Sequence, residues 1–181
     1  MKKQIIIAAK NVGIISVICF VTSLFYWIFV TFNLGGLGYL LFYNPFLSAL
    51  VHADLSHFAY NMLMLFLCLI PAINQDYKIK QLVYVATILS FLYFPLILFQ
   101  FSLPIIGISM FAYFLLARIV FSREKYFWFF LSVFVITLIG EATLIQSDDN
   151  TAHLAHIFGA TLGTISTRFS PKLFRPAKSI T

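Results

Sequence analysis

Long apolar stretches separated by short polar segments make up almost the whole sequence. Six of these stretches have the composition of helices in a lipid bilayer, whose apolar core of about 30 Å is crossed by roughly 20 helical residues. Prolines, glycines and charged clusters between the stretches mark the expected helix ends. The predicted membrane helices cover residues 12–32, 54–73, 82–101, 107–121, 126–145 and 151–169.

The fourth apolar stretch, residues 107–121, is shorter than the other five. Because it is too short to cross a bilayer core of about 30 Å, we expect this helix to begin recessed within the membrane. Gly107 suits the entry to a helix better than its interior, which places Ser109 at the start of the helical run. A hydroxyl group at this depth needs a polar partner, because burying it alone is costly. Ser109 is therefore a candidate functional residue.

The composition agrees with a membrane location and excludes a water-soluble globule. Hydrophobic residues make up 61% of the chain, charged residues 10%, and the mean hydropathy is +0.96. We therefore predict an all-α, multi-pass integral membrane protein in which residues 1–181 form a single domain. Cys19 and Cys68 both lie inside apolar runs, so they are expected to be small core residues and not a disulfide.

The basic residues predict the orientation of the chain in the membrane. The net charge is +6, and the Lys and Arg residues fall into four short clusters that alternate with the spans. By the positive-inside rule, both termini and the loops at 74–81 and 118–125 are cytoplasmic. This distribution argues against a nucleic-acid partner and for a lipid bilayer as the surroundings. The small size favours a bacterial cell (inner) membrane.

All four histidines lie on the non-cytoplasmic side of this arrangement. His52 and His57 flank the start of the second helix, and His153 and His156 lie in the first turns of the sixth. The helix that contains Ser109 starts from the same side. Since polar groups inside a bilayer are costly, their collection at one depth indicates a functional site.

The sixth helix carries small residues that predict close packing. Gly159 and Gly163 are one turn apart on the broad face of His156, so another helix can approach closely there. The expected neighbour is the Ser109 helix, because a serine becomes a useful nucleophile when a histidine within about 3 Å accepts its proton. The glycines that follow favour His156 as this base, and His153 is expected to be a solvent-side neighbour.

Acyl transfer also needs donors for the negative charge that develops on the carbonyl oxygen. The candidates are the backbone N–H of Ser109, the side-chain amide of Asn61 and the imidazole of His57. Asn61 and His57 are four residues apart and hence share a helix face. Glu141 lies toward the end of the fifth helix and the nearest aspartates are in a loop, so no acidic residue is expected to orient His156. The residues predict a Ser–His dyad and not a triad.

Three motifs resemble those of the rhomboid family of intramembrane serine proteases. Family members carry H-x4-H-x3-N, then G-x-S with a Tyr one turn later, then A-H-x-x-G-x-x-x-G. The motifs occur here in the same order, on the second, fourth and sixth predicted helices, and the resemblance covers nearly the whole chain as a bare six-helix core. The residues that match are His52, His57 and Asn61; Gly107, Ser109 and Tyr113; and Ala155, His156, Gly159 and Gly163.

The resemblance implies a six-transmembrane-helix rhomboid-like bundle with a short recessed fourth helix. It also implies a serine endopeptidase that cleaves single-pass transmembrane proteins near the non-cytoplasmic face, with no cofactor and no metal. The implied roles are nucleophile for Ser109 and base for His156. Oxyanion binding or support falls to His57, Asn61, His52 and Gly107, while Tyr113 packs against the His156 ring.

Two other interpretations stay open. Rhomboid proteases usually have Gly directly after the serine, where this chain has Met110. A side chain there could crowd the oxyanion site or point to lipid, so a catalytically inactive rhomboid-like protein that binds transmembrane clients is the alternative. The first loop also lacks the Trp-Arg pair common in the family. The third interpretation is a metal-dependent enzyme, with the four histidines as ligands.

Overall fold

A computed structural model of the chain describes residues 2–32, 47–73, 79–98, 108–122, 127–144 and 153–169. In these ranges every regular element is helical, as expected where a backbone must satisfy its own hydrogen bonds. The prediction of an all-α fold is therefore confirmed for this part of the chain. The elements are α1 (Lys2–Thr31), a 3₁₀ turn η1 (Ser48–Leu50), α3 (Leu55–Ile73), α4 (Ile79–Leu98), α5 (Ser109–Phe121), α6 (Phe127–Leu144) and α7 (His153–Phe169).

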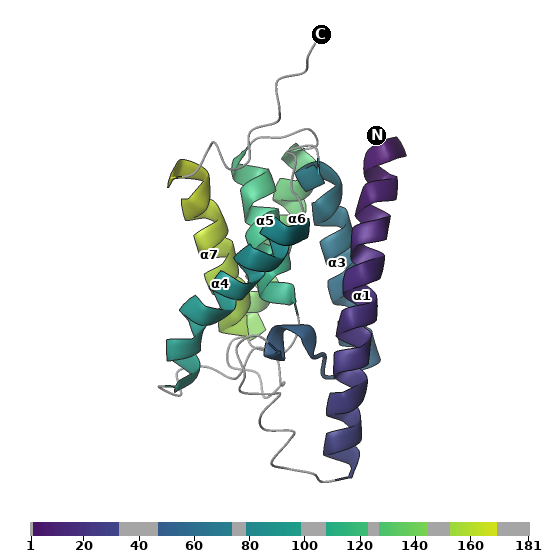
Figure 1. Cartoon of the computed structure of the whole chain (residues 1–181). Helices are drawn as coiled ribbons and strands as arrows, with labels where there is room; N and C mark the ends of the chain where they lie inside the picture. The colour runs from purple at the N-terminus through teal and green to yellow at the C-terminus, as the bar shows by residue number, and fades with distance from the viewer. Residues whose placement is uncertain are drawn as a thin grey trace.

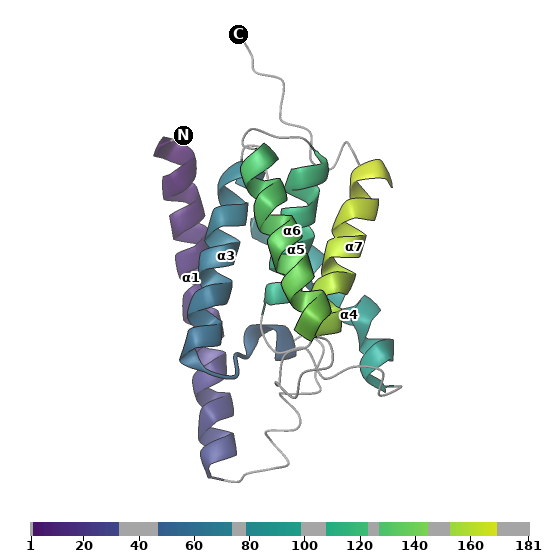
Figure 2. The ribbon, with the colours of Figure 1, turned by 180° about the vertical axis from the view of Figure 1, so that it is seen from behind.

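Helix α5 lies in the middle of the bundle, with α3, α6 and α7 packed against it (Figures 1 and 2). Helix α1 packs on α3, and α4 crosses in front of α5 in the view of Figure 1. Helices α3, α5 and α7 run in one direction, and α6 runs in the opposite direction. The starts of α3, α5 and α7 and the end of α6 consequently lie at the same end of the bundle.

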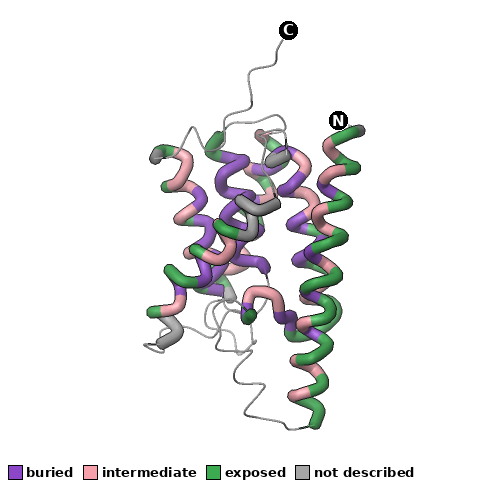
Figure 3. Tube along the Cα trace, viewed as in Figure 1, coloured by how far each residue is buried: buried purple, intermediate pink, exposed green. Residues whose placement is uncertain are grey.

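The burial of side chains follows this arrangement (Figure 3). Every residue of α5 from Ser109 to Val120 is buried, although the helix has only 13 residues. Helix α1, at the edge of the bundle, instead exposes large apolar side chains such as Val17 and Phe25. An exterior this apolar fits a lipid environment and not water.

Two glycines allow α7 to lie directly against α5, and these two helices form the most extensive helix pair of the structure. A Cβ atom at Gly159 would fall onto the carbonyl oxygen of Met110. One at Gly163 would fall onto the carbonyl oxygen of Phe114 and near the Cβ of Ala117. Hydrogen is thus the largest substituent that fits at either position, which is how small residues bring helices close together.

The helix boundaries agree with the sequence prediction to within a few residues, with one exception. Helix α1 begins at Lys2 and not near residue 12, because the lysine-containing segment before the apolar stretch consists of good helix formers. By length and composition, one helix in the described ranges passes as a membrane span, within Lys3–Thr31 of α1. Four others carry shorter apolar stretches of 10–17 residues.

Arg118 differs from the expectation that it belongs to a cytoplasmic loop. Helix α5 continues past it to Phe121, and its side chain is buried. One guanidinium nitrogen donates to the Ser166 hydroxyl of α7 at 2.6 Å, and the guanidinium carbon lies 6.0 Å from the centre of the Phe114 ring. A cation in the last turn also interacts favourably with the helix dipole. Arg118 thus connects α5 to α7 at the end of the bundle opposite Ser109.

The glycine packing predicts the effect of adding one methyl group. Gly159→Ala and Gly163→Ala should each lower the free energy of unfolding by about 1–3 kcal/mol, because the new Cβ meets backbone atoms that cannot move aside. Gly140→Ala is the matched control, since open space surrounds the position of its Cβ on α6. Thermal unfolding of the purified proteins in detergent measures the difference. Equal melting temperatures for all three variants and the wild type would contradict the packing.

Candidate active site

Ser109 is the first residue of α5 and follows Ile108 at the N-cap position. The carbonyl oxygen of Ile108 accepts the backbone N–H groups of Phe111 and Ala112, each at 3.1 Å, which closes the first turn. The Ser109 side chain is 3% exposed, so its hydroxyl lies inside the bundle. The helix therefore begins where the sequence places it. Gly107 lies outside the described residues.

The side chains of Ser109 and His156 meet across the contact between α5 and α7. Ser109 Oγ lies 2.7 Å from His156 Nε2, and both residues are buried. His156 lies in the first turn of α7, one turn before Gly159, so the close helix approach at that glycine also brings the ring to the hydroxyl. A serine hydroxyl within hydrogen-bond distance of an imidazole is the arrangement needed to activate the oxygen as a nucleophile.

Tyr113 packs against one face of the His156 ring. It lies one turn after Ser109 on α5, and its ring stacks on the imidazole with 4.6 Å between ring centres and 4° between planes. The expectation that Tyr113 packs against His156 therefore matches the geometry. Stacking on one face and the contact with Ser109 at one edge restrict the rotation of the imidazole.

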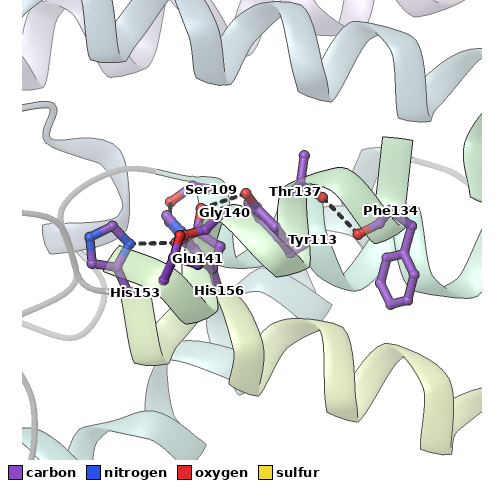
Figure 4. A network of polar contacts seen from close by, with 9 residues as sticks. Ser109, Tyr113, Phe134, Thr137, Gly140, Glu141, His153 and His156 are labelled. Atoms are coloured by element: carbon purple, nitrogen blue, oxygen red, sulfur yellow. Dashed lines mark hydrogen bonds and ion pairs between the residues drawn. The ribbon is translucent and has the colours of Figure 1, made fainter. Parts of the chain in front are cut away.

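Glu141 corrects the expectation that no acidic residue reaches His156. Its carboxylate Oε2 lies 2.8 Å from His156 Nδ1, and its Oε1 accepts the Tyr113 hydroxyl at 2.6 Å (Figure 4). The prediction was wrong because the position of Glu141 near the end of its helix does not by itself show which neighbouring helix its side chain can reach. That end of α6 lies beside the start of α7, so the carboxylate reaches the imidazole directly.

His153 corrects a second expectation, because it is 6% exposed and not a solvent-side neighbour. Its Nδ1 lies 2.6 Å from Glu141 Oε2, the same oxygen that contacts His156 (Figure 4). A signal for this cluster was present in the sequence. Glu141 is the single charged residue in the apolar stretch 126–145, and an ionisable residue inside a span is expected to face the bundle interior and pair there.

Asn61 and His57 lie on α3, whose start is held by an N-cap. Asp54 Oδ1 accepts the backbone N–H of His57 at 2.8 Å. Asn61, one turn further on, is 1% exposed, and its amide nitrogen donates to no acceptor in the described part of the chain. Since buried donors are almost always paired, an amide in this state is free to donate to a bound ligand. His57 lies in the first turn of α3, one turn before Asn61.

His52 is fixed from both sides just before α3. The Ser23 hydroxyl of α1 accepts its backbone N–H at 2.9 Å, and the indole N–H of Trp27 donates to its carbonyl oxygen at 2.9 Å. Its buried ring packs edge-on against the His57 ring, with 5.4 Å between centres. Burial lowers the pKa of His52 to about 4, so its ring is neutral near pH 7. His52 thus supports His57 by packing and not by charge.

Met110 follows Ser109 directly and does not point to the exterior of the bundle. It is 2% exposed, and it lies against Gly159 of α7. The absence of a side chain at Gly159 provides the room that Met110 occupies. Of the two positions considered from the sequence, the lipid-facing one is therefore wrong, and the side chain belongs to the α5–α7 contact.

The histidines do not gather as one set of four in the described residues. One group there has side-chain atoms close enough for a shared metal ion, with all ligand atoms within 4.8 Å of one another, and it consists of Glu141, His153 and His156. His52 and His57 form a separate pair on the α3 side. The expectation that all four histidines would serve as ligands of one metal ion is therefore wrong.

The comparisons with known proteins identify the family. A family model described as the Rhomboid domain matches residues 41–170, which include helices α3 to α7 and every candidate residue named above. Comparisons with curated proteins and with solved structures gave no match. The family match covers most of the 181 residues. The chain therefore belongs to the rhomboid family of integral membrane proteins, whose members are generally serine proteases.

Proposed function

We propose that this protein is an intramembrane serine endopeptidase that cleaves single-pass transmembrane proteins near the non-cytoplasmic face of the membrane. The observation that carries the proposal is the 2.7 Å contact between Ser109 Oγ and His156 Nε2 at the buried start of α5. Membership of the rhomboid family supports the same chemistry. The substrate segment must be unwound, because a helical backbone has its carbonyl groups paired and shielded.

The reaction follows from the atoms that meet at this contact. His156 Nε2 accepts the hydroxyl proton as Ser109 Oγ forms a bond to the scissile carbonyl carbon. Collapse of the tetrahedral intermediate breaks the C–N bond, and His156 returns the proton to the leaving amine. Water, activated by the same imidazole, then hydrolyses the acyl-serine and restores both side chains.

The developing oxyanion needs donors near Ser109. The amide nitrogen of Asn61 is one candidate, because it is buried on the neighbouring helix and has no acceptor among the described residues. The backbone N–H groups of Ser109 and Met110 form no backbone hydrogen bond to another described residue, as expected at a helix N-terminus. His57 supplies a further N–H from α3.

The proposed orientation places the active-site end of the bundle on the non-cytoplasmic side, in a bacterial cell (inner) membrane. Lys2 and Lys3 at the start of α1 and Arg168 at the end of α7 lie at the opposite end, and Asp54 lies at the active-site end (Figure 1). Basic residues are enriched on the cytoplasmic side of membrane proteins. Both termini are therefore proposed to be cytoplasmic.

Substitution of either member of the pair tests the function. Ser109→Ala and His156→Ala should each abolish cleavage of a generic single-pass transmembrane substrate by the purified protein in detergent, because the first removes the nucleophile and the second removes the base. Gly140→Ala serves as the folded control. Equal cleavage by wild type and both variants would overturn the serine mechanism. A wild type that binds the substrate without cleaving it would instead support the inactive client-binding protein.

Asn61→Ala should lower kcat about 10²–10³-fold with a small change in KM, because the lost donor acts on charge that develops in the transition state. Met62→Leu is the matched control, since Met62 is the next buried residue on α3 and the change conserves volume. The measurement is steady-state kinetics on the same substrate. A wild-type kcat for Asn61→Ala would remove this residue from the oxyanion site.

The orientation predicts the activity of reporter fusions. Alkaline phosphatase, which folds only outside the cytoplasm, should be inactive when fused after residue 181 and active when fused after residue 148, in the loop between α6 and α7. A green fluorescent protein at the same positions should give the reverse result. Active phosphatase at residue 181 would show that the proposed orientation is inverted.

A further inference from the structure

The carboxylate of Glu141 is the point where side chains from three helices meet (Figure 4). It projects from α6 and is 12% exposed. Its Oε1 accepts the Tyr113 hydroxyl of α5 at 2.6 Å, and its Oε2 contacts Nδ1 of His153 at 2.6 Å and Nδ1 of His156 at 2.8 Å, both on α7. A carboxylate buried to this extent requires such partners, because isolated burial of its charge is very costly.

The partners of Glu141 define its protonation state by hydrogen-bond chemistry. The Tyr113 hydroxyl donates to Oε1, and an imidazole Nδ1 can donate to Oε2 when its proton is on that nitrogen. Since a donor can face each of the two oxygens, the carboxyl group accepts hydrogen bonds in its ionised form. The negative charge therefore sits directly beside the imidazole of His156.

This contact selects the tautomer of His156 that can act as a base. A carboxylate beside Nδ1 favours the proton on that nitrogen, which leaves the lone pair on Nε2. Nε2 is the atom that lies 2.7 Å from Ser109 Oγ. The opposite tautomer would point an N–H at the serine oxygen and could not accept its proton.

The same contact stabilises the imidazolium that forms during the reaction. Oε2 is 2.8 Å from Nδ1, so the carboxylate and a protonated imidazole form a close ion pair. This Coulomb attraction appears only when His156 takes the serine proton. An interaction that strengthens as the transition state forms accelerates the reaction.

We propose that Glu141 is a positioning residue that sets the tautomer of His156 and stabilises its imidazolium, so that the site is a Ser109–His156–Glu141 triad. This inference rests on the proposed protease function. His153 and Tyr113 take part by holding the two carboxylate oxygens in place. Tyr113 acts on the triad twice, since it stacks on the His156 ring and donates to Glu141.

Three substitutions at or beside the carboxylate separate an orienting role from a structural one. Glu141→Gln keeps the size of the side chain and removes its charge, and it should lower kcat about 100-fold or more with KM changed less than threefold. Glu141→Asp retains the charge, so its kcat should be at least tenfold higher than that of Glu141→Gln. Thr143→Val is the matched control on α6, because Thr143 is exposed and, among the described residues, its hydroxyl donates to the Gly140 carbonyl oxygen alone.

The pH dependence of kcat/KM is the readout that a merely structural role would not move. Without the carboxylate, the negative charge beside His156 is lost, so the pH profile of kcat/KM should differ from that of the wild type in Glu141→Gln and not in Thr143→Val. The other titratable groups that face this pair are His153 on α7, Tyr113 on α5, and Tyr60 and His57 on α3. The Glu141→Gln substitution leaves these four residues unchanged.

The outcomes distinguish this inference from the function on which it rests. If Ser109→Ala still cleaves, the serine mechanism fails and the triad fails with it. If Ser109→Ala is inactive but Glu141→Gln keeps the wild-type kcat and pH profile, the triad alone is overturned. Inhibition of the wild type by 1,10-phenanthroline that Zn²⁺ reverses would assign Glu141, His153 and His156 to a metal ion and would also overturn the orienting role.

Discussion

The close approach of α5 and α7 is the constraint on which the rest of the site depends. Gly159 and Gly163 lie against the carbonyl oxygens of Met110 and Phe114, so the two helices are separated by less than the width of ordinary side chains. Without this approach the short Ser109 side chain could not reach an imidazole on another helix. The glycines of the histidine motif thus set the distance between two backbones, and with it the contact between Ser109 and His156.

The second organising feature is the carboxylate of Glu141, which lies inside the bundle. Glu141 brings a carboxylate from α6 to the His156 edge opposite Ser109, and its other contacts come from Tyr113 and His153. Each of these residues lies at the same end of the bundle, because α6 runs opposite to α5 and α7. In a low-dielectric interior such a pair interacts far more strongly than it would in water. The fold therefore places a carboxylate directly beside the histidine that contacts Ser109.

Most of the fold and part of the site could be predicted from the sequence, for physical reasons that differ by residue. Ser109 and His156 could be predicted, because helix entry signals and glycine spacing are local features of the sequence. Glu141 was missed because its partners come from other helices, and the direction of a side chain at a helix end depends on packing that no local pattern records. Arg118 was misplaced for a related reason, since its contact with Ser166 forms only when α5 and α7 meet.

In the proposed mechanism, His156 makes the Ser109 hydroxyl nucleophilic inside a rhomboid domain. The most direct measurement is the reaction of the folded protein in detergent with a fluorophosphonate, which modifies activated serines, followed by mass spectrometry of the peptides. We expect one phosphonylated residue, Ser109, in the wild type and no modification in His156→Ala. Wild-type protein without an adduct at Ser109, or equal labelling of Ser109 in His156→Ala, would contradict it.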